Sequence, residues 1–248
     1  MSAAPSRERL PAPDPAQALV VIPTYNERES LPALAAEVLA LPGDWRLLVV
    51  DDNSPDGTGE LAEKLARRDP RITVLHRPRK EGLGPAYLAA FEEVLSRPDV
   101  EFVLQMDADF SHHPADLPRL LEAAAEADLV IGSRYVPGGH TEGWGFRRRL
   151  LSRWGNAYVR LVLGIPVRDV TAGFRCWRRW ALEALDRQAV RTRGYGFQVE
   201  MAYRLVRAGG RVREVPICFT ERRAGRSKMS GSIITEALVL PWRLRRLP

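Results

Sequence analysis

Short apolar runs alternate with amphipathic segments through the first half of the chain. The runs, which we predict to be strands, span residues 19–23, 46–51, 72–76, 101–107 and 128–134. In the segments between them apolar residues recur at i, i+3 and i+4, which predicts helices over residues 29–41, 57–68, 83–96 and 114–127. Strands that are apolar throughout are typical of parallel sheets buried on both faces. The alternation therefore predicts an α/β fold with a mostly parallel, Rossmann-like sheet covered by helices.

This regular alternation ends after Arg134. From there we expect Gly- and Arg-rich loops, two helices over residues 147–162 and 197–208, and a strand over residues 212–220. The second half of the chain is therefore expected to be irregular.

The same patterns divide the chain into three parts. Residues 1–18, rich in Pro and Ala, are predicted to be a disordered lead-in with no apolar core of the kind that a signal peptide has. Residues 19–229 are predicted to form one domain, and residues 230–248 an amphipathic C-terminal helix. No apolar run approaches the roughly 20 residues that a membrane-spanning helix needs.

Charge and cysteine content narrow the class of protein. The 248 residues carry a formal net charge of +6, which permits an anionic partner such as a nucleotide, a nucleic acid or an acidic membrane surface. The two cysteines, Cys176 and Cys218, are far apart and lack metal-type spacing. We interpret them as reduced residues of a cytoplasmic protein.

Carboxylates end two of the predicted strands. Asp51 and Asp52 close one, and Asp107 and Asp109 close another with one small residue between them. Because residues i and i+2 of a strand face the same side, Asp107 and Asp109 should converge. Carboxylates this close repel unless a cation joins them, and a hard divalent ion completed by substrate phosphates would do so. The alternative is that all four simply end strands and begin turns or helices.

A third strand end supplies groups suited to a nucleoside. Tyr25 offers an aromatic face and Glu27 a carboxylate, which suit a base and its ring N–H or ribose hydroxyls, whereas Asn26 is read as a helix cap. No G-x-G-x-x-G follows this strand and no G-x-x-x-x-G-K-[ST] occurs, so the dinucleotide and P-loop readings lose their main support. His112 and His113 are read as a polar turn before Pro114, in preference to metal ligands.

Basic residues gather in the second half, at Arg134, Arg147–Arg149 and the stretch "ERRAGRSKMSG". Arginine forks bind phosphate bidentately, although a run of charge is more often a solvated face. Nucleic acid is the weaker reading of the ligand, because the basic residues lack interleaved aromatic residues and follow an apparent metal site.

Taken in order, these motifs resemble glycosyltransferase family 2 with the GT-A fold, and more closely the dolichol- or polyprenol-phosphate mannosyltransferases. The resemblance covers nearly all of residues 19–230 and rests on "IPTYNERESL", "VVDDNSPDGT", "MDADFSHHP", "GSRYVPGG", "DVTAGFRCWRR", "GYGFQVEM" and "GRSKM". "DDNS" and D-x-D by themselves mark only the wider family.

The resemblance implies roles for individual residues. Asp107 and Asp109 would hold Mg²⁺ or Mn²⁺ on the donor diphosphate, and Arg134 and Arg148 would receive the lipid phosphate. The guanosine and donor pocket would be lined by Pro23, Tyr25, Glu27, Val50, Asp52 and Ala108. Four further residues would close over the donor and acceptor phosphates, namely Gln198, Arg222, Arg226 and Lys228. Some relatives have Gln at the position of Ser111, which puts a metal contact there in doubt.

The resemblance also implies an activity, which is transfer of mannose from GDP-mannose to a polyprenyl monophosphate with inversion at the anomeric carbon. UDP-glucose as donor, or a non-catalytic nucleotide-sugar-binding protein, are the alternatives. Since the acceptor tail lies in a membrane, the enzyme would be peripheral on the inner face of the cell membrane, and whether it needs an integral membrane partner stays open. The tail with Trp242, Arg243, Arg245 and Arg246 suits an interfacial anchor or, equally, a helix packed on the domain.

Overall fold

The computed structural model describes residues 12–192, 194, 196–221 and 231–246, with only the backbone described over 231–237. In the lead-in, a 3-10 helix over Pro15–Gln17 immediately precedes the first strand. No helix in the described part of the chain is long and apolar enough to cross a membrane.

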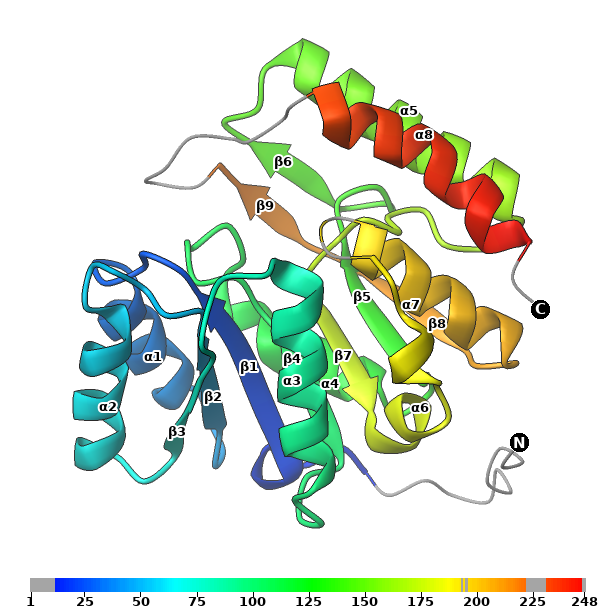
Figure 1. Ribbon diagram of the computed structural model, residues 1–248. Helices are drawn as coiled ribbons and strands as arrows, with labels where there is room; N and C mark the ends of the chain where they lie inside the picture. The colour runs from blue at the N-terminus through cyan, green and yellow to red at the C-terminus, as the bar shows by residue number, and fades with distance from the viewer. Residues whose placement is uncertain (1–11, 193, 195, 222–230, 247–248) are drawn as a thin grey trace.

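A seven-stranded sheet forms the centre of the molecule (Figure 1), in the order β3-β2-β1-β4-β7-β5-β8. Its strands are β1 (Ala18–Thr24), β2 (Arg46–Asp51), β3 (Ile72–His76), β4 (Phe102–Gln105), β5 (Leu129–Ser133), β7 (Arg175–Arg178) and β8 (Val212–Pro216). All neighbours pair in parallel except β7, which runs antiparallel to both β4 and β5. The predicted α/β class and its five N-terminal strands are confirmed.

Helices cover both faces of this sheet. One apolar cluster joins alternate strand residues such as Val21 and Val50 to helices on one face, which are α3 (Leu83–Leu95), α6 (Arg179–Glu183) and α7 (Gly196–Arg207). The other cluster joins Val20 and Val49 to α1 (Leu31–Leu39), α2 (Thr58–Arg68) and α4 (Leu117–Ala123). Successive residues of a strand point to opposite faces, so an entirely apolar strand feeds both clusters.

Strand β7 is absent from the sequence prediction because its pattern is not that of a buried strand. Two of its four residues are arginines, and both are buried. Backbone carbonyls solvate the guanidinium of Arg175, which donates to Ala172, Gln198 and Val170 at 2.7–2.9 Å. Burial lowers the pKa of Arg175 to about 9. β7 is therefore an interior strand of the sheet, between β4 and β5, although half of its residues are charged.

The predicted strand over residues 212–220 is divided. β8 ends at Pro216, and β9 (Cys218–Thr220) pairs in parallel with β6 (His140–Glu142) in a separate two-stranded sheet. Proline has no N–H to continue a ladder. The next residue, Ile217, donates its N–H to Ser133 and accepts from His140, so it carries the chain from one sheet to the other.

Beyond the end of the sheet toward which β1 points, α5 (Phe146–Leu163) and α8 (Gly231–Arg245) lie side by side (Figure 1). Trp242 donates to the hydroxyl of Tyr158 at 2.9 Å, and that hydroxyl donates to the carbonyl of Leu238 at 2.8 Å. The predicted C-terminal helix therefore forms and packs on a second helix.

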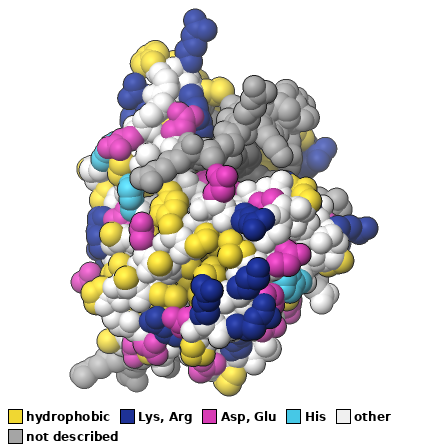
Figure 2. Space-filling view, turned by 90° about the vertical axis from the view of Figure 1, so that its left-hand side faces the viewer, with side chains coloured by type: hydrophobic (Ala, Val, Ile, Leu, Met, Phe, Trp, Pro, Cys, Tyr) yellow, Lys and Arg dark blue, Asp and Glu magenta, His cyan; other side chains and the backbone are white. Residues whose placement is uncertain are grey.

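The edge of the sheet that β3 forms carries mixed charge. Figure 2 views the molecule from the side of α1, α2 and β3, where Lys and Arg side chains lie among Asp and Glu side chains. Several of these residues are ion-paired, among them Arg71 with Asp69 at 2.7 Å. This edge therefore carries charges of both signs.

Candidate active site

Asp51 organises the loop that follows β2. Its carboxylate accepts hydrogen bonds from the Thr24 hydroxyl at 3.1 Å and from the Ser54 N–H and hydroxyl at 3.0 and 2.6 Å. The ends of β1 and β2 are thereby tied together. Asp51 is thus the carboxylate of the pair for which the turn-forming explanation holds.

Asp52, the predicted nucleotide contact, is buried beside the same strand end and forms an ion pair with Arg77. Arg77 also donates to Glu81 at 2.9 Å. Burial raises the pKa of Asp52, and the Arg77 guanidinium acts in the opposite direction. A ligand that reaches Asp52 therefore meets a carboxylate already held in place by a cation, and its contact with a nucleotide stays a prediction.

The loop after β1 holds the other predicted nucleoside contacts. The ammonium of Lys80 lies 3.5 Å from the centre of the Tyr25 ring, a cation–π arrangement. The Glu27 carboxylate accepts from Ser30 at 3.0 Å. Pro23 is partly exposed at the strand end, whereas the Val50 side chain is enclosed in the core, so that residue could reach a ligand only through its backbone.

Asp107, Ala108 and Asp109 follow β4 at the neighbouring strand end. Asp109 accepts from the Ser111 N–H at 3.0 Å, and Phe110 has φ 59°, a left-handed conformation that is rare for a bulky residue. Both carboxylates are partly exposed, Asp107 to 36%, while Ala108 between them is buried. β4 ends at Gln105, so the two carboxylates lie in the turn and not on the strand as expected, and both are accessible; their convergence on one ion stays a prediction.

The buried His112 side chain holds this turn by a hydrogen bond to its backbone. The N–H of Asp107 donates to Nδ1 of His112 at 3.3 Å, and the ring stacks on Phe174 with centroids 4.8 Å apart. Burial lowers the pKa of His112 to about 4, so the ring is neutral and accepts this hydrogen bond. Residues 111–113 do form the predicted turn, and the supporting role of His112 has no signal in the sequence.

Gln198 is a buried amide that borders Gly173, as the Asp107 carboxylate does. Neither its Oε1 nor its Nε2 has a hydrogen-bond partner within the described residues. A Cβ at Gly173 would lie 3.7 Å from Oδ2 of Asp107 and 3.9 Å from Nε2 of Gln198, so the amide and the carboxylate flank one glycine. Buried polar groups are rarely unpaired. Gln198 is therefore a candidate to hydrogen-bond a ligand beside Asp107.

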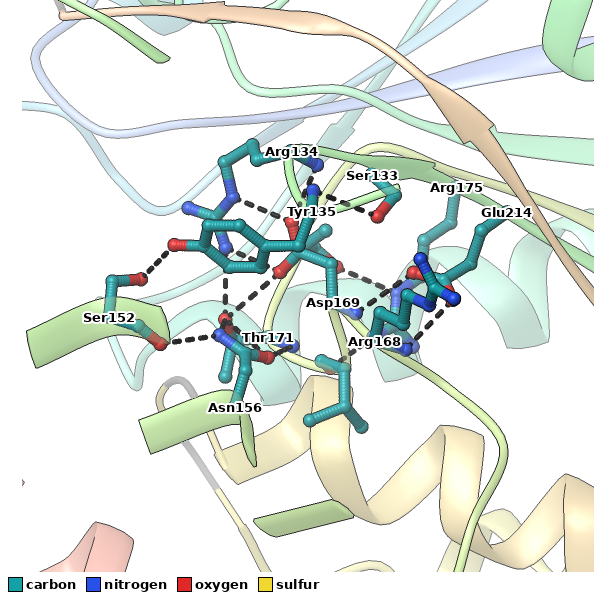
Figure 3. Close-up of polar contacts among 12 residues, drawn as sticks. Ser133, Arg134, Tyr135, Ser152, Asn156, Arg168, Asp169, Thr171, Arg175 and Glu214 are labelled. Atoms are coloured by element: carbon teal, nitrogen blue, oxygen red, sulfur yellow. Dashed lines mark hydrogen bonds and ion pairs between the residues drawn. The ribbon is translucent and has the colours of Figure 1, made fainter. Parts of the chain in front are cut away.

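Arg134 lies at the centre of a hydrogen-bond network (Figure 3). Its Nε and Nη2 donate to the two oxygens of Asp169 at 2.7 and 2.6 Å, and its backbone N–H donates to the same carboxylate at 2.9 Å. Asp169 is fully buried, and its own N–H donates to Glu214 at 2.9 Å. The predicted phosphate ligand Arg134 is thus oriented by a carboxylate that the sequence reading did not single out.

The network extends to α5. The Tyr135 hydroxyl donates to the Ser152 hydroxyl at 2.6 Å (Figure 3). The Thr171 hydroxyl accepts from the Asn156 amide at 3.1 Å and from the Arg134 guanidinium at 3.0 Å. Burial raises the pKa of Tyr135, so its hydroxyl stays protonated. Arg134 is therefore fixed relative to helix α5.

Arg148, the second predicted phosphate ligand, lies in the first turn of α5. Its guanidinium is 4.0 Å from the centre of the Trp144 ring and donates to Glu221 at 2.6 Å. The guanidinium of Arg134 is 5.4 Å from the same Trp144 ring, so both arginines border one indole. The remaining predicted ligands, Arg222, Arg226 and Lys228, lie outside the described residues.

The donor set fits a hard divalent cation. Asp107 and Asp109 supply carboxylate oxygens, the ligands that Mg²⁺ and Mn²⁺ prefer. The Gln198 amide, which has no hydrogen-bond partner in the described residues, borders the same glycine as the Asp107 carboxylate. Asp107 and Asp109 would hold the ion.

Comparison with known proteins identifies the family of the chain. Residues 19–186 match the model of glycosyl transferase family 2. The chain is 50% identical over 99% of its length to the polyprenol monophosphomannose synthase of Mycolicibacterium smegmatis, covering 96% of that protein. It is 51% identical to the undecaprenyl-phosphate mannosyltransferase of Micrococcus luteus, with 89% of this chain and 90% of that protein aligned.

A solved structure supports the fold. The complex of glucosyl-3-phosphoglycerate synthase from Mycobacterium tuberculosis with Mn²⁺, UDP-glucose and phosphoglyceric acid superposes with a TM-score of 0.67 at 20% identity. The superposition covers 93% of this chain and 80% of that one. The chain is a glycosyltransferase with the predicted GT-A fold, and it belongs to glycosyl transferase family 2.

Proposed function

We propose that the protein transfers mannose from GDP-mannose to a polyprenyl monophosphate, giving polyprenyl-phosphate mannose and GDP with inversion. The names of two relatives about 50% identical over most of their length support the acceptor class and the sugar. The observation in the structure that carries the proposal is the turn that exposes the Asp107 and Asp109 carboxylates, together with the buried Gln198 amide, which borders the same glycine as Asp107 and has no hydrogen-bond partner in the described residues. GDP as the carrier of the sugar rests on the resemblance of the sequence motifs.

At the donor, Tyr25, Glu27 and Asp52 are proposed to surround the nucleoside, with Pro23, Val50 and Ala108 as backbone or apolar contacts. Asp107 and Asp109 would hold Mg²⁺ or Mn²⁺, which when bound neutralises charge on the leaving diphosphate. Gln198 would donate to a diphosphate or sugar oxygen. Arg222, Arg226 and Lys228 are proposed to add positive charge there as the bond from the anomeric carbon to the diphosphate breaks.

At the acceptor, Arg134 and Arg148 are proposed to bind the lipid phosphate. A phosphate monoester has a second pKa of about 6, so at neutral pH it is a dianion that needs no strong general base. Its oxygen forms the new bond to the anomeric carbon as GDP leaves. The task of the protein is then to orient the phosphate, and Asp169 performs it indirectly by fixing the guanidinium of Arg134.

A donor panel tests this proposal directly. We expect lipid-linked mannose from GDP-mannose and a polyprenyl phosphate, and at least about a hundredfold less product from UDP-glucose, because a site that hydrogen-bonds one base leaves polar groups unpaired with another. Product is measured by chromatography and mass spectrometry of the lipid fraction. Preferential use of UDP-glucose would assign the protein to glucosyl transfer, and no transfer with either donor would contradict the enzyme proposal.

Gln198→Met should separate function from stability. In the free protein the buried amide is unpaired within the described residues, so its removal should leave the free energy of unfolding unchanged or raise it by about 1 kcal/mol. Transfer should fall by about tenfold or more. Gln105→Met is the matched control, because this buried amide accepts from the Trp177 indole at 2.8 Å and its loss should destabilise the fold. Urea unfolding and steady-state rates decide, and unchanged transfer by Gln198→Met would remove Gln198 from the site.

The protein is further proposed to work as a peripheral protein at the inner face of the cell membrane. The acceptor carries a long prenyl tail, and no described helix could span a membrane. The surface that meets the membrane is a separate question.

A further inference from the structure

Helix α5 exposes large apolar side chains to solvent. Phe146 is 71% exposed, Trp154 70% and Leu161 82%, and Leu150 and Leu151 are each nearly half exposed. Folded proteins rarely leave such a group of side chains uncovered. In the described residues, the large exposed apolar side chains are confined to α5 and its neighbour α8.

The exposed residues form a stripe along the outer side of α5. An α-helix turns by about 100° per residue, so Phe146, Leu150, Trp154 and Leu161 fall within a sector of about 80°. The buried side chains of α5 project on the other side of the helix; they are Asn156, Val159, Val162 and Leu163. α5 therefore has two apolar faces, one packed on the domain and one directed outward.

Arginines border this stripe on both sides. By the same rotation Arg149, Arg153 and Arg160 lie beside one edge, and Arg147 lies beside the other. α5 contains five arginines and no acidic residue, and these four form no ion pair with any residue in the described ranges. Figure 2 shows hydrophobic and basic side chains projecting together at the top of the view, where α5 begins.

α8 widens the stripe. Leu238, Val239 and Trp242 are exposed, and Trp242 is joined to α5 through the hydroxyl of Tyr158. Trp154 and Trp242 thus lie on adjoining helices with apolar and basic neighbours. Tryptophan and arginine favour the boundary between lipid headgroups and acyl chains.

We propose that the α5–α8 helix pair is the membrane-docking surface, with α5 lying in the interface of an anionic bilayer. Unpaired positive charge beside an apolar stripe matches an anionic lipid surface, and would leave arginines uncompensated against a second copy of the same face. The inference rests on the proposed function, because a lipid acceptor needs its phosphate brought to Arg148 in the first turn of α5. The C-terminal helix, for which the sequence left an anchor or a packed helix equally open, contributes the smaller number of exposed apolar side chains to this surface.

Vesicle binding without donor or acceptor tests the surface. Wild type should co-sediment with phosphatidylcholine vesicles containing phosphatidylglycerol, less well with pure phosphatidylcholine, and less well at high salt. Arg149→Glu/Arg160→Glu should weaken binding by at least about 30-fold, since each basic residue near such a surface contributes about fivefold. Lys64→Glu/Arg67→Glu on α2 makes the same change in net charge at the other end of the molecule and should bind as wild type does.

A second variant tests the apolar part. Trp154→Ser/Leu161→Ser removes two exposed side chains, so the fold should persist by circular dichroism while vesicle binding falls by about tenfold or more. Equal binding by both α5 variants and wild type would overturn the proposal. So would a stable dimer in solution, measured by analytical ultracentrifugation, that the Trp154→Ser/Leu161→Ser variant dissolves.

The acceptor assay distinguishes this inference from the proposed function. On a short, water-soluble prenyl phosphate the α5 variants should match wild type, whereas on long-chain acceptor in anionic vesicles they should lose activity in proportion to binding. Transfer by no form of the protein would contradict the proposed function and leave the binding result to stand by itself. Full activity of the variants on vesicle-bound acceptor would contradict the docking surface.

Discussion

Asp107→Asn and Asp109→Asn should each reduce mannosyl transfer by about a thousandfold. A divalent ion at a leaving diphosphate is worth several kcal/mol of transition-state stabilisation, and each 1.4 kcal/mol is about tenfold in rate. Both carboxylates are partly exposed, and the bond to His112 comes from the backbone N–H of Asp107, so either substitution should leave the fold intact. Initial rates and unfolding by urea measure the two effects.

The matched control is Asp99→Asn. Asp99 is an exposed carboxylate before β4, paired with Arg46, and so lies at the opposite end of the strand from Asp107. It should keep full activity. EDTA should reproduce the loss in wild type, and Mg²⁺ or Mn²⁺ should restore it. Binding of GDP by calorimetry should depend on metal in wild type and lose that dependence in the variants, and full activity in EDTA would sink the metal assignment.

The part of this site that the sequence predicts is the part built by strand ends. β1 and β2 end close to the residues predicted from the sequence, whereas β4 ends at Gln105, two residues before its predicted end. Because these strands are parallel neighbours, Tyr25, Asp52 and Asp107 all follow carboxyl ends at the same side of the sheet. Two of the loops that follow contain Asn26 and Asn53 with positive φ, which asparagine tolerates. In these loops the residue types that end a strand are visible in the sequence, and the parallel sheet fixes where the loops lie.

What escapes the sequence is set by long-range partners. Arg175 reads as a surface residue, but the carbonyls of the nearby Val170 and Ala172 and of the distant Gln198 enclose its guanidinium. Asp169 lies 35 residues from Arg134, and no spacing rule joins them. The C-terminal segment suits a membrane interface by its sequence, because it is basic and contains Trp242, whereas the outward face of α5 is recognised only once the buried face of that helix is known. Burial distinguishes residues that resemble one another in sequence.

The Arg134–Asp169 pair gives the largest stability effect that we expect. Asp169→Ala should lower the free energy of unfolding by about 3–5 kcal/mol, because it leaves the largely buried Arg134 guanidinium without its carboxylate. The backbone N–H of Arg134 also loses its acceptor. Urea unfolding at several protein concentrations measures the change.

A partly exposed ion pair of the same length is the control for this effect. Asp116 and Arg119 approach to 2.6 Å, as Asp169 and Arg134 do, but the Arg119 side chain is 49% exposed and that of Asp116 16%, so Asp116→Ala should cost less than about 1 kcal/mol. Replacing both members of the buried pair, as Arg134→Met/Asp169→Ala, should recover part of the loss, because no buried charge is then left unpaired. Equal costs for Asp169→Ala and Asp116→Ala would mean that solvent reaches Arg134. In that case the guanidinium is not fixed by Asp169, and its proposed orientation toward the acceptor phosphate fails with it.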